Sequence, residues 1–149
     1  MPTNLDADGM RAVVQLHSDC EVGRDWPGAI ATMIDSPWYE FHPMRLKLTS
    51  LQAITECWGR TLGLECFGQP GSEYLSFEEY IGDDSVLHIR QTRFEDLEGK
   101  RQETRTIVRY GFDGDKICSE IFTMDDALLP YFRMAFDEEF MGLPGVAHF

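Results

Sequence analysis

Two histidines have positions in this chain that suit proton-transfer chemistry. His42 ends the short aromatic segment 38–42 and is followed by Pro43, while His17 lies on the apolar face of a predicted helix. An imidazole titrates near neutral pH, so one ring can accept a proton while the other polarises a carbonyl or hydroxyl group. An inward histidine on an apolar helix face is also common as a hydrogen-bonded core residue. Both interpretations remain open for His17 and His42 from the sequence.

Helical periodicity predicts two helices before segment 38–42. Asp6 or Asp8 caps the first helix, and His17 belongs to its apolar face. Asp25 caps the second, whose apolar stripe continues to Ile34.

A short strand and a third helix follow. Segment 38–42 is aromatic and apolar, which favours a strand, and Pro43 closes it. Thr49 and Gln52 form a capping box that begins the next helix, and Gly63 ends that helix.

The second half of the chain changes to a period of two, which is typical of half-buried strands. Glycine-containing turns separate these segments and indicate hairpins. We expect antiparallel strands over residues 74–81, 85–97, 101–112 and 116–124. Phenylalanines at helical spacing predict a final helix within 126–140.

This order of elements predicts an α+β fold in one domain spanning residues 1–149, with a core at about 8–126 and a C-terminal helix and tail at 126–149. Helices are expected to cover one face of the antiparallel sheet. Strands of about 12 residues must bend. We therefore expect a curved sheet wrapped around the N-terminal helices, forming a cone with an internal apolar pocket.

Composition favours a small-molecule ligand over several other classes of partner. The net charge of −13 disfavours nucleic acid and anionic membranes, and no segment approaches the length of a membrane span. Four separated cysteines without a CxxC pair are expected to be reduced thiols of a cytoplasmic protein. No metal-ligand spacing, phosphate loop or nucleophile motif occurs, so neither a metal nor another cofactor is predicted.

Basic residues are concentrated between positions 90 and 116, in a chain that is otherwise strongly acidic. This basic segment either meets an acidic partner surface or flanks a site for an anionic ligand.

Two segments carry motifs that recur together in one superfamily. They are DWPGAIATMIDSPWYEFHP (25–43) and EGKRQETRTIVRYGFDGDKICSEIFTMDD (98–126). The second follows a pattern of hairpin, long strand, FDG-x-KI turn and last strand ending in aspartate. In both segments the chain resembles the NTF2-like superfamily of cystatin-like α+β cones, and within it SnoaL-like polyketide cyclases and ketosteroid isomerases. The resemblance covers most of residues 10–126.

The resemblance places histidines where ketosteroid isomerases have catalytic groups. The aspartate before the strand-ending proline corresponds to His42, and the oxyanion tyrosine of the first helix corresponds to His17. The second acidic donor corresponds to Val108. Because none of the three isomerase residues is kept, the resemblance argues against that steroid mechanism and leaves a pair of imidazoles in a related pocket.

The resemblance also implies which strand faces line this pocket. Glu120 would be a carboxylate among apolar neighbours with a raised pKa, and Tyr110 a phenolic donor; Asp19 ranks below Glu120. With the opposite strand phase, Glu120 would instead be solvated beside Arg105 or Arg109. The further residues expected at the pocket are Trp38, Cys57, Trp58, Arg93, Val108, Phe122 and Met124.

We expect a SnoaL-like, cofactor-independent enzyme that transfers protons on a small hydrophobic carbonyl or hydroxyl compound, by cyclisation, isomerisation or dehydration. His42 would be the base, His17 the electrophilic partner, and Glu120 or Tyr110 the supporting group. The alternative is a non-catalytic, dimeric ligand-binding or protein-interaction module of the same fold, and an adaptor like the nuclear transport factor is a third possibility. The resemblance implies a homodimer through the outer sheet face.

Overall fold

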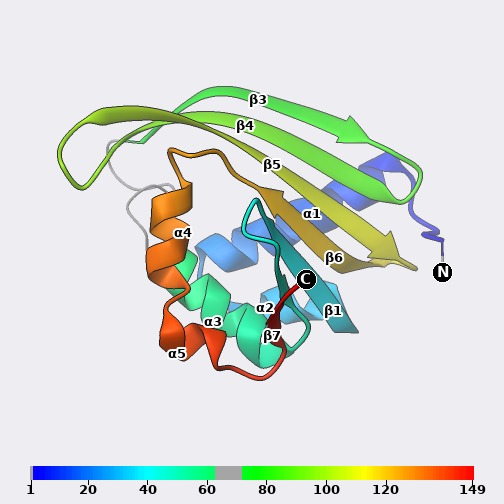
Figure 1. Ribbon diagram of the computed structural model, residues 1–149. Coiled ribbons are helices and arrows are strands. Elements are labelled where there is room, and N and C mark those ends of the chain that lie inside the picture. Colours follow the sequence, from blue (N-terminus) through cyan, green and yellow to red (C-terminus); the bar gives the residue numbers. More distant parts are fainter. Residues whose placement is uncertain (1, 63–71) are drawn as a thin grey trace.

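A strongly curved sheet arches over the N-terminal helices in the computed structural model, which describes residues 2–62 and 72–149 (Figure 1). Within these residues the sheet has seven strands in the order β3-β4-β5-β6-β1-β2-β7. The strands are β1 (Met33–His42), β2 (Leu46–Leu48), β3 (Glu73–Ile81), β4 (Ser85–Glu95), β5 (Arg101–Asp113), β6 (Lys116–Thr123) and β7 (Val146–His148). The expected α+β architecture is confirmed.

Strands β3 to β6 form the antiparallel meander expected from the sequence, because each is joined to the next by a short turn. Gly99 and Gly114 occupy two of these turns with φ of 78° and 63°, a backbone conformation that glycine adopts without a steric penalty. Strand β1 then pairs in parallel with β6, and the short strands β2 and β7 extend that edge.

The helices lie against the concave side of the sheet and at its open end (Figure 1). Their bounds are α1 (Ala7–Val22), α2 (Trp26–Ala31), α3 (Leu51–Thr61), α4 (Leu129–Ala135) and α5 (Glu138–Met141). None of the helices in the described part of the chain has the length and apolar character that crossing a membrane requires.

The first helix begins as expected, since the Asp6 side chain accepts a hydrogen bond from the backbone of Gly9. The second helix is shorter than expected and ends at Ala31, so Ile34 belongs to β1. Asp25 does cap this helix. The expected capping box is wrong, because Ser50 and not Thr49 caps α3.

The C-terminal region also differs from the prediction. The expected single helix within 126–140 is divided into α4 and α5, and the Asp137 side chain caps the second piece. Strands β2 and β7 pair with each other and were not predicted. The expected helix stop at Gly63 and the thiol of Cys66 lie outside the described residues; Cys20, Cys57 and Cys118 are free thiols.

The core fills the space between the sheet and the helices. Its largest fully buried side chains come from the sheet, α1, α3 and the C-terminal region, and include Phe94, Phe132, Phe140, Ile54 and Ile117. Burying each large apolar side chain contributes about 1.5–3 kcal/mol. This packing fixes the backbone that positions the polar residues between the sheet and the helices.

Candidate active site

Strand register places Glu120 between two tyrosines. On β6, Glu120 is directly opposite Tyr110 of β5 and beside Tyr39 of β1. Directly paired residues on neighbouring strands project from the same face of a sheet. The three side chains therefore point together toward the concave side.

A cavity of about 470 Å³ opens at this point between the sheet and the helices α1 and α3. Its wall combines aromatic and apolar side chains with a few charged groups, as is usual for a site that binds a small organic molecule. The lining residues include Glu21, Tyr39, Trp58, Arg90, Tyr110 and Glu120.

His17 lies fully buried on α1, and the hydrogen bonds of its Nδ1 atom define its tautomer. Nδ1 is 2.7 Å from Oγ1 of Thr32 and 3.3 Å from the carbonyl oxygen of Ala29. Thr32 donates its own hydroxyl proton to that carbonyl at 2.6 Å, so its oxygen must accept from His17. The Nδ1 atom therefore carries a proton.

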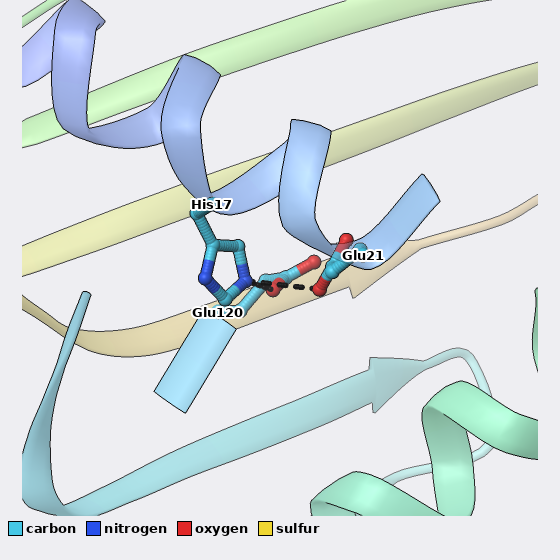
Figure 2. A group of neighbouring side chains, drawn as sticks. All are labelled: His17, Glu21 and Glu120. Carbon is cyan, nitrogen blue, oxygen red and sulfur yellow. Dashed lines mark ion pairs between the residues drawn. The ribbon is translucent and has the colours of Figure 1, made fainter. Parts of the chain in front are cut away.

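The other ring nitrogen faces two carboxylates (Figure 2). His17 Nε2 is 2.9 Å from Oε1 of Glu21, one helical turn away, and 3.8 Å from Oε2 of Glu120. The hydroxyl of Tyr39 lies 3.3 Å from the same nitrogen. Burial disfavours a charged ring, but the hydrogen bond and charge of Glu21, with the charge of Glu120, outweigh it and raise the pKa of His17. A carboxylate only accepts, so Nε2 donates to Glu21, and a ring with a proton on each nitrogen is an imidazolium.

Glu120 combines burial with an incompletely satisfied carboxyl group. Its Oε2 atom is inaccessible to solvent and has no hydrogen-bond partner within the described residues. Burial and the negative charge of Glu21 raise the pKa of Glu120 to about 7, although the charges of His17 and Arg90 and a hydrogen bond with Tyr39 oppose the shift. A carboxyl group of this kind exchanges a proton readily near neutral pH.

Tyr39 and Tyr110 remain protonated under the same conditions. Burial, with the negative charge of Glu120, raises the pKa of Tyr110 and raises that of Tyr39 well above the usual value. The Tyr39 hydroxyl donates to Sδ of Met33 at 3.7 Å, and both tyrosines keep the hydroxyl proton that donation to a ligand at the cavity wall requires. Such donors can stabilise an oxygen atom that gains negative charge during a reaction.

His17, Glu21 and Glu120 also have the chemistry of metal ligands. One ligand atom from each lies within 4.8 Å of the other two. Two ligands on opposite sides of a divalent ion are about 4.2 Å apart when each bond is about 2.1 Å long, so this group could close around a cation after a small movement. The present 2.9 Å contact between His17 and Glu21 already satisfies both groups through a proton.

His42 lies on the opposite face of the sheet from Glu120. It pairs in register with the exposed Thr123, whereas the cavity residue Phe41 pairs with Phe122. Its Nε2 atom is 3.1 Å from Oε2 of Glu40, and its ring contacts Phe149. The structure therefore separates the two histidines that were expected to act together, and His42 does not line the cavity.

Some of the other predicted residues line the cavity and some do not. Glu120 and Tyr110 line the cavity, as do the predicted pocket residues Cys57, Trp58, Val108 and Phe122. Three predicted pocket residues do not: Trp38 lies under the ammonium group of Lys47, Arg93 pairs with Glu73 and Glu103, and Met124 is buried in the core. Asp19 lies at the cavity wall and accepts a hydrogen bond from Gln15.

Sequence reasoning missed three residues of the site. Glu21 is four residues after His17, a spacing that puts both on one helix face, and this signal was available. Tyr39 and Arg90 line the cavity because their faces of β1 and β4 point inward. The alternation of polar and apolar residues in the sequence did not show which face of each strand points inward.

Comparison with known proteins supports the fold. No family model matches the sequence, and no curated protein matches it either. Solved structures do match. An NTF2-like protein from Burkholderia xenovorans has a TM-score of 0.69 at 11% identity, with 85% of this chain and 97% of that chain covered. Bal32a, from a soil-derived mobile gene cassette, has a TM-score of 0.65 at 18% identity, covering 85% of this chain and 98% of its own.

A protein from Shewanella putrefaciens that is assigned as a SnoaL-like polyketide cyclase has a TM-score of 0.61 at 12% identity, with 86% of each chain covered. The chain described here therefore has the NTF2-like fold, as its sequence motifs predicted. Identities this low establish the fold and leave the activity to be argued from the site.

Proposed function

We propose that this chain is a SnoaL-like enzyme that transfers a proton on a small hydrophobic carbonyl or hydroxyl compound, in a cyclisation, isomerisation or dehydration. The observation that carries the proposal is the state of Glu120. Its Oε2 atom is buried at the wall of the cavity without a hydrogen-bond partner in the described part of the chain. A buried carboxyl oxygen without a hydrogen-bond partner lowers the free energy of unfolding, and a functional role explains why the chain carries one at this cavity.

Each residue of the site has a role that its contacts support. Glu120 removes a proton from the ligand and returns it at another atom. Tyr39 and Tyr110, on the strands beside it, donate hydrogen bonds to the ligand oxygen where negative charge develops. His17 is a positioning residue that holds Glu21 and lowers the pKa of Glu120 by its positive charge. Apolar groups such as Trp58 bind the hydrocarbon part.

The test uses a reaction that needs only proton transfer beside a carbonyl group. Protein is incubated with 1-tetralone in D₂O, and loss of the α-proton signal is followed by NMR. Replacing Glu120 by Gln should lower the protein-catalysed exchange rate by about 100-fold, because the amide cannot accept the proton. The matched control is Glu40→Gln, which changes a carboxyl group of the neighbouring strand that pairs with His42 and Lys47 on the other face.

The ligand-binding alternative makes a different prediction in the same experiment. A non-catalytic module would bind 1-tetralone without accelerating exchange over buffer, and Glu120→Gln would then leave the rate unchanged. That result would contradict the proposed enzyme.

A resident metal ion would be detected separately. If His17, Glu21 and Glu120 held a divalent cation, added Zn²⁺ or Mn²⁺ would raise the melting temperature of the wild-type protein and not of Glu21→Gln. Shared-proton chemistry predicts no such difference between the two proteins.

A further inference from the structure

Arg90 is a half-buried cation in the cavity wall that lacks a carboxylate partner. No carboxylate of the described residues lies within 4.0 Å of its guanidinium group, although the chain carries a net charge of −13. Two other arginines of the sheet are paired: Arg93 with Glu103 at 2.9 Å, and Arg109 with Asp84 at 3.8 Å. An unpaired guanidinium beside a cavity is a strong donor of hydrogen bonds to an anion.

A neutral histidine holds Arg90 in place. His88 is buried and lies two residues before Arg90 on β4, so both side chains are on the same face of the strand. Its Nε2 atom is 2.9 Å from Oε2 of Glu79. A carboxylate only accepts, so this nitrogen carries the proton and Nδ1 is left as an acceptor. Nδ1 lies 3.4 Å from Nη2 of Arg90, which donates to it. The ring is fixed further by edge contacts with Phe77 and Tyr110.

This support differs from an ion pair in one important respect. The imidazole satisfies one donor of the guanidinium group without neutralising its charge. Glu79, which could neutralise this charge, is instead bound by Arg11 at 2.6 Å and by His88 at 2.9 Å. The positive charge of Arg90 is therefore positioned at the cavity and left available.

The carboxylates of the cavity wall do not compete strongly for that charge. Glu21 is paired with His17, and Asp19 accepts from Gln15. Glu120 is beyond 4.0 Å from the guanidinium group, as the absence of an ion pair between these two described residues indicates. The apolar lining near Arg90 includes Val108 and the ring of Tyr110.

We infer that the cavity takes an organic anion, an aromatic carboxylate or a comparable oxyanion, whose charged group binds Arg90 while its ring lies against the apolar wall. This deepens the proposed function by naming the substrate class. It also selects between the two interpretations of the basic segment 90–116, since Arg90 belongs to that segment and serves a ligand site. Binding requires no turnover, so the inference can fail or hold independently of catalysis.

The experiment compares 2-naphthoate with its uncharged methyl ester. Dissociation constants are measured by isothermal titration calorimetry with the Glu120→Gln protein, which binds without proton transfer. We expect 2-naphthoate to bind about tenfold or more tightly than the ester. Arg90→Met should abolish that preference by weakening 2-naphthoate alone, and Arg90→Lys should restore part of it.

Arg93→Met is the matched control, because Arg93 lies three residues away on the same strand and does not line the cavity. It should leave both dissociation constants unchanged. Equal affinities for the two probes, an equal loss for both in Arg90→Met, or no binding of either probe at millimolar concentration would each overturn the anion site. If one of these three outcomes occurred while Glu120→Gln still lost α-proton exchange, the enzyme proposal would stand and the proposed substrate class would not.

Discussion

Tyr110 and Glu120 lie directly opposite each other on β5 and β6, with both side chains at the wall of the cavity. One group keeps its proton well above neutral pH, while the other titrates at about 7. Environments that separate the pKa values of neighbouring groups in this way assign a donor and a base to one site. Because strand register creates the pair, the core that fixes the sheet also fixes the relative positions of these two groups.

The first prediction is the pH dependence of α-proton exchange. Glu120 accepts a proton only when ionised, and its pKa is raised from 4.5 to about 7. The exchange rate should therefore be low at pH 5, rise through about pH 7 and level off above pH 8, as measured by NMR in buffered D₂O after correction for the buffer rate. A rate that already levels off near pH 5 would mean that Glu120 is not the base.

The second prediction concerns the charge of His17. Its imidazolium lowers the pKa of Glu120, so a neutral side chain should move the midpoint of the pH profile to higher values. Asparagine is the suitable replacement, because its amide nitrogen can still donate to Thr32 in place of Nδ1. Circular dichroism should show that His17→Asn remains folded.

His42→Asn is the matched control for this experiment. It removes an imidazole from the outer face of the sheet, so both the rate and the midpoint should stay as in the wild type. If His42→Asn instead lowered exchange by about 100-fold, the role assigned to His42 from the sequence would be restored and Glu120 would lose its place as the base.

The sequence predicted the period of the strands better than their phase. Strands β3 to β6 were recognised because polar and apolar residues alternate and glycine turns separate them. In segment 38–42, however, aromatic residues occur on both faces, so alternation could not decide whether Tyr39 or His42 points inward. The register shift between Met33 and Trp38, around Pro37, is a tertiary feature that local patterns do not show.

The same ambiguity affected β4. The expected place of Arg93 at the pocket requires Leu87 and Ile89, which share its strand face, to point inward. The buried set is in fact Val86 and His88, and Arg90 lines the cavity. Because β4 carries apolar side chains on its outer face as well as its inner face, the two faces have similar hydrophobicity in the sequence. Alternation therefore does not show which face is buried.

The third prediction concerns stability. A carboxyl group whose pKa is raised on folding stabilises the folded state below its unfolded pKa and loses this contribution as pH rises through its folded pKa. For Glu120 the window runs from 4.5 to about 7. At 1.36 kcal/mol per pH unit, Glu120→Gln should gain about 3 kcal/mol of unfolding free energy over the wild type between pH 4.5 and pH 8.

Urea unfolding at a series of pH values measures this difference. The control is Glu40→Gln, whose carboxyl group lies on the outer face beside Lys47 and should show no comparable gain. If the free energies of Glu120→Gln and the wild type differed by the same amount at every pH, Glu120 would have an ordinary pKa and the proposed acid–base role would lose its support.

The fourth prediction tests the homodimer implied by the family resemblance. The outer face of the central strands carries three half-buried isoleucines. Ile89 is directly opposite Ile107, and Ile121 lies on the next strand, opposite Arg109. Covering them with the same face of a second chain would bury apolar area around a two-fold axis. Light scattering should therefore give twice the chain mass of 17.1 kDa.

Ile107→Glu should convert that dimer to a monomer, because two introduced carboxylates would be buried near the two-fold axis. Met134→Glu is the control, since Met134 is 60% exposed on α4, away from the outer face, and its replacement should leave the mass unchanged. A wild-type mass of one chain would contradict the dimer. In that case the cavity chemistry would stand unaffected, because every residue assigned to it comes from a single chain.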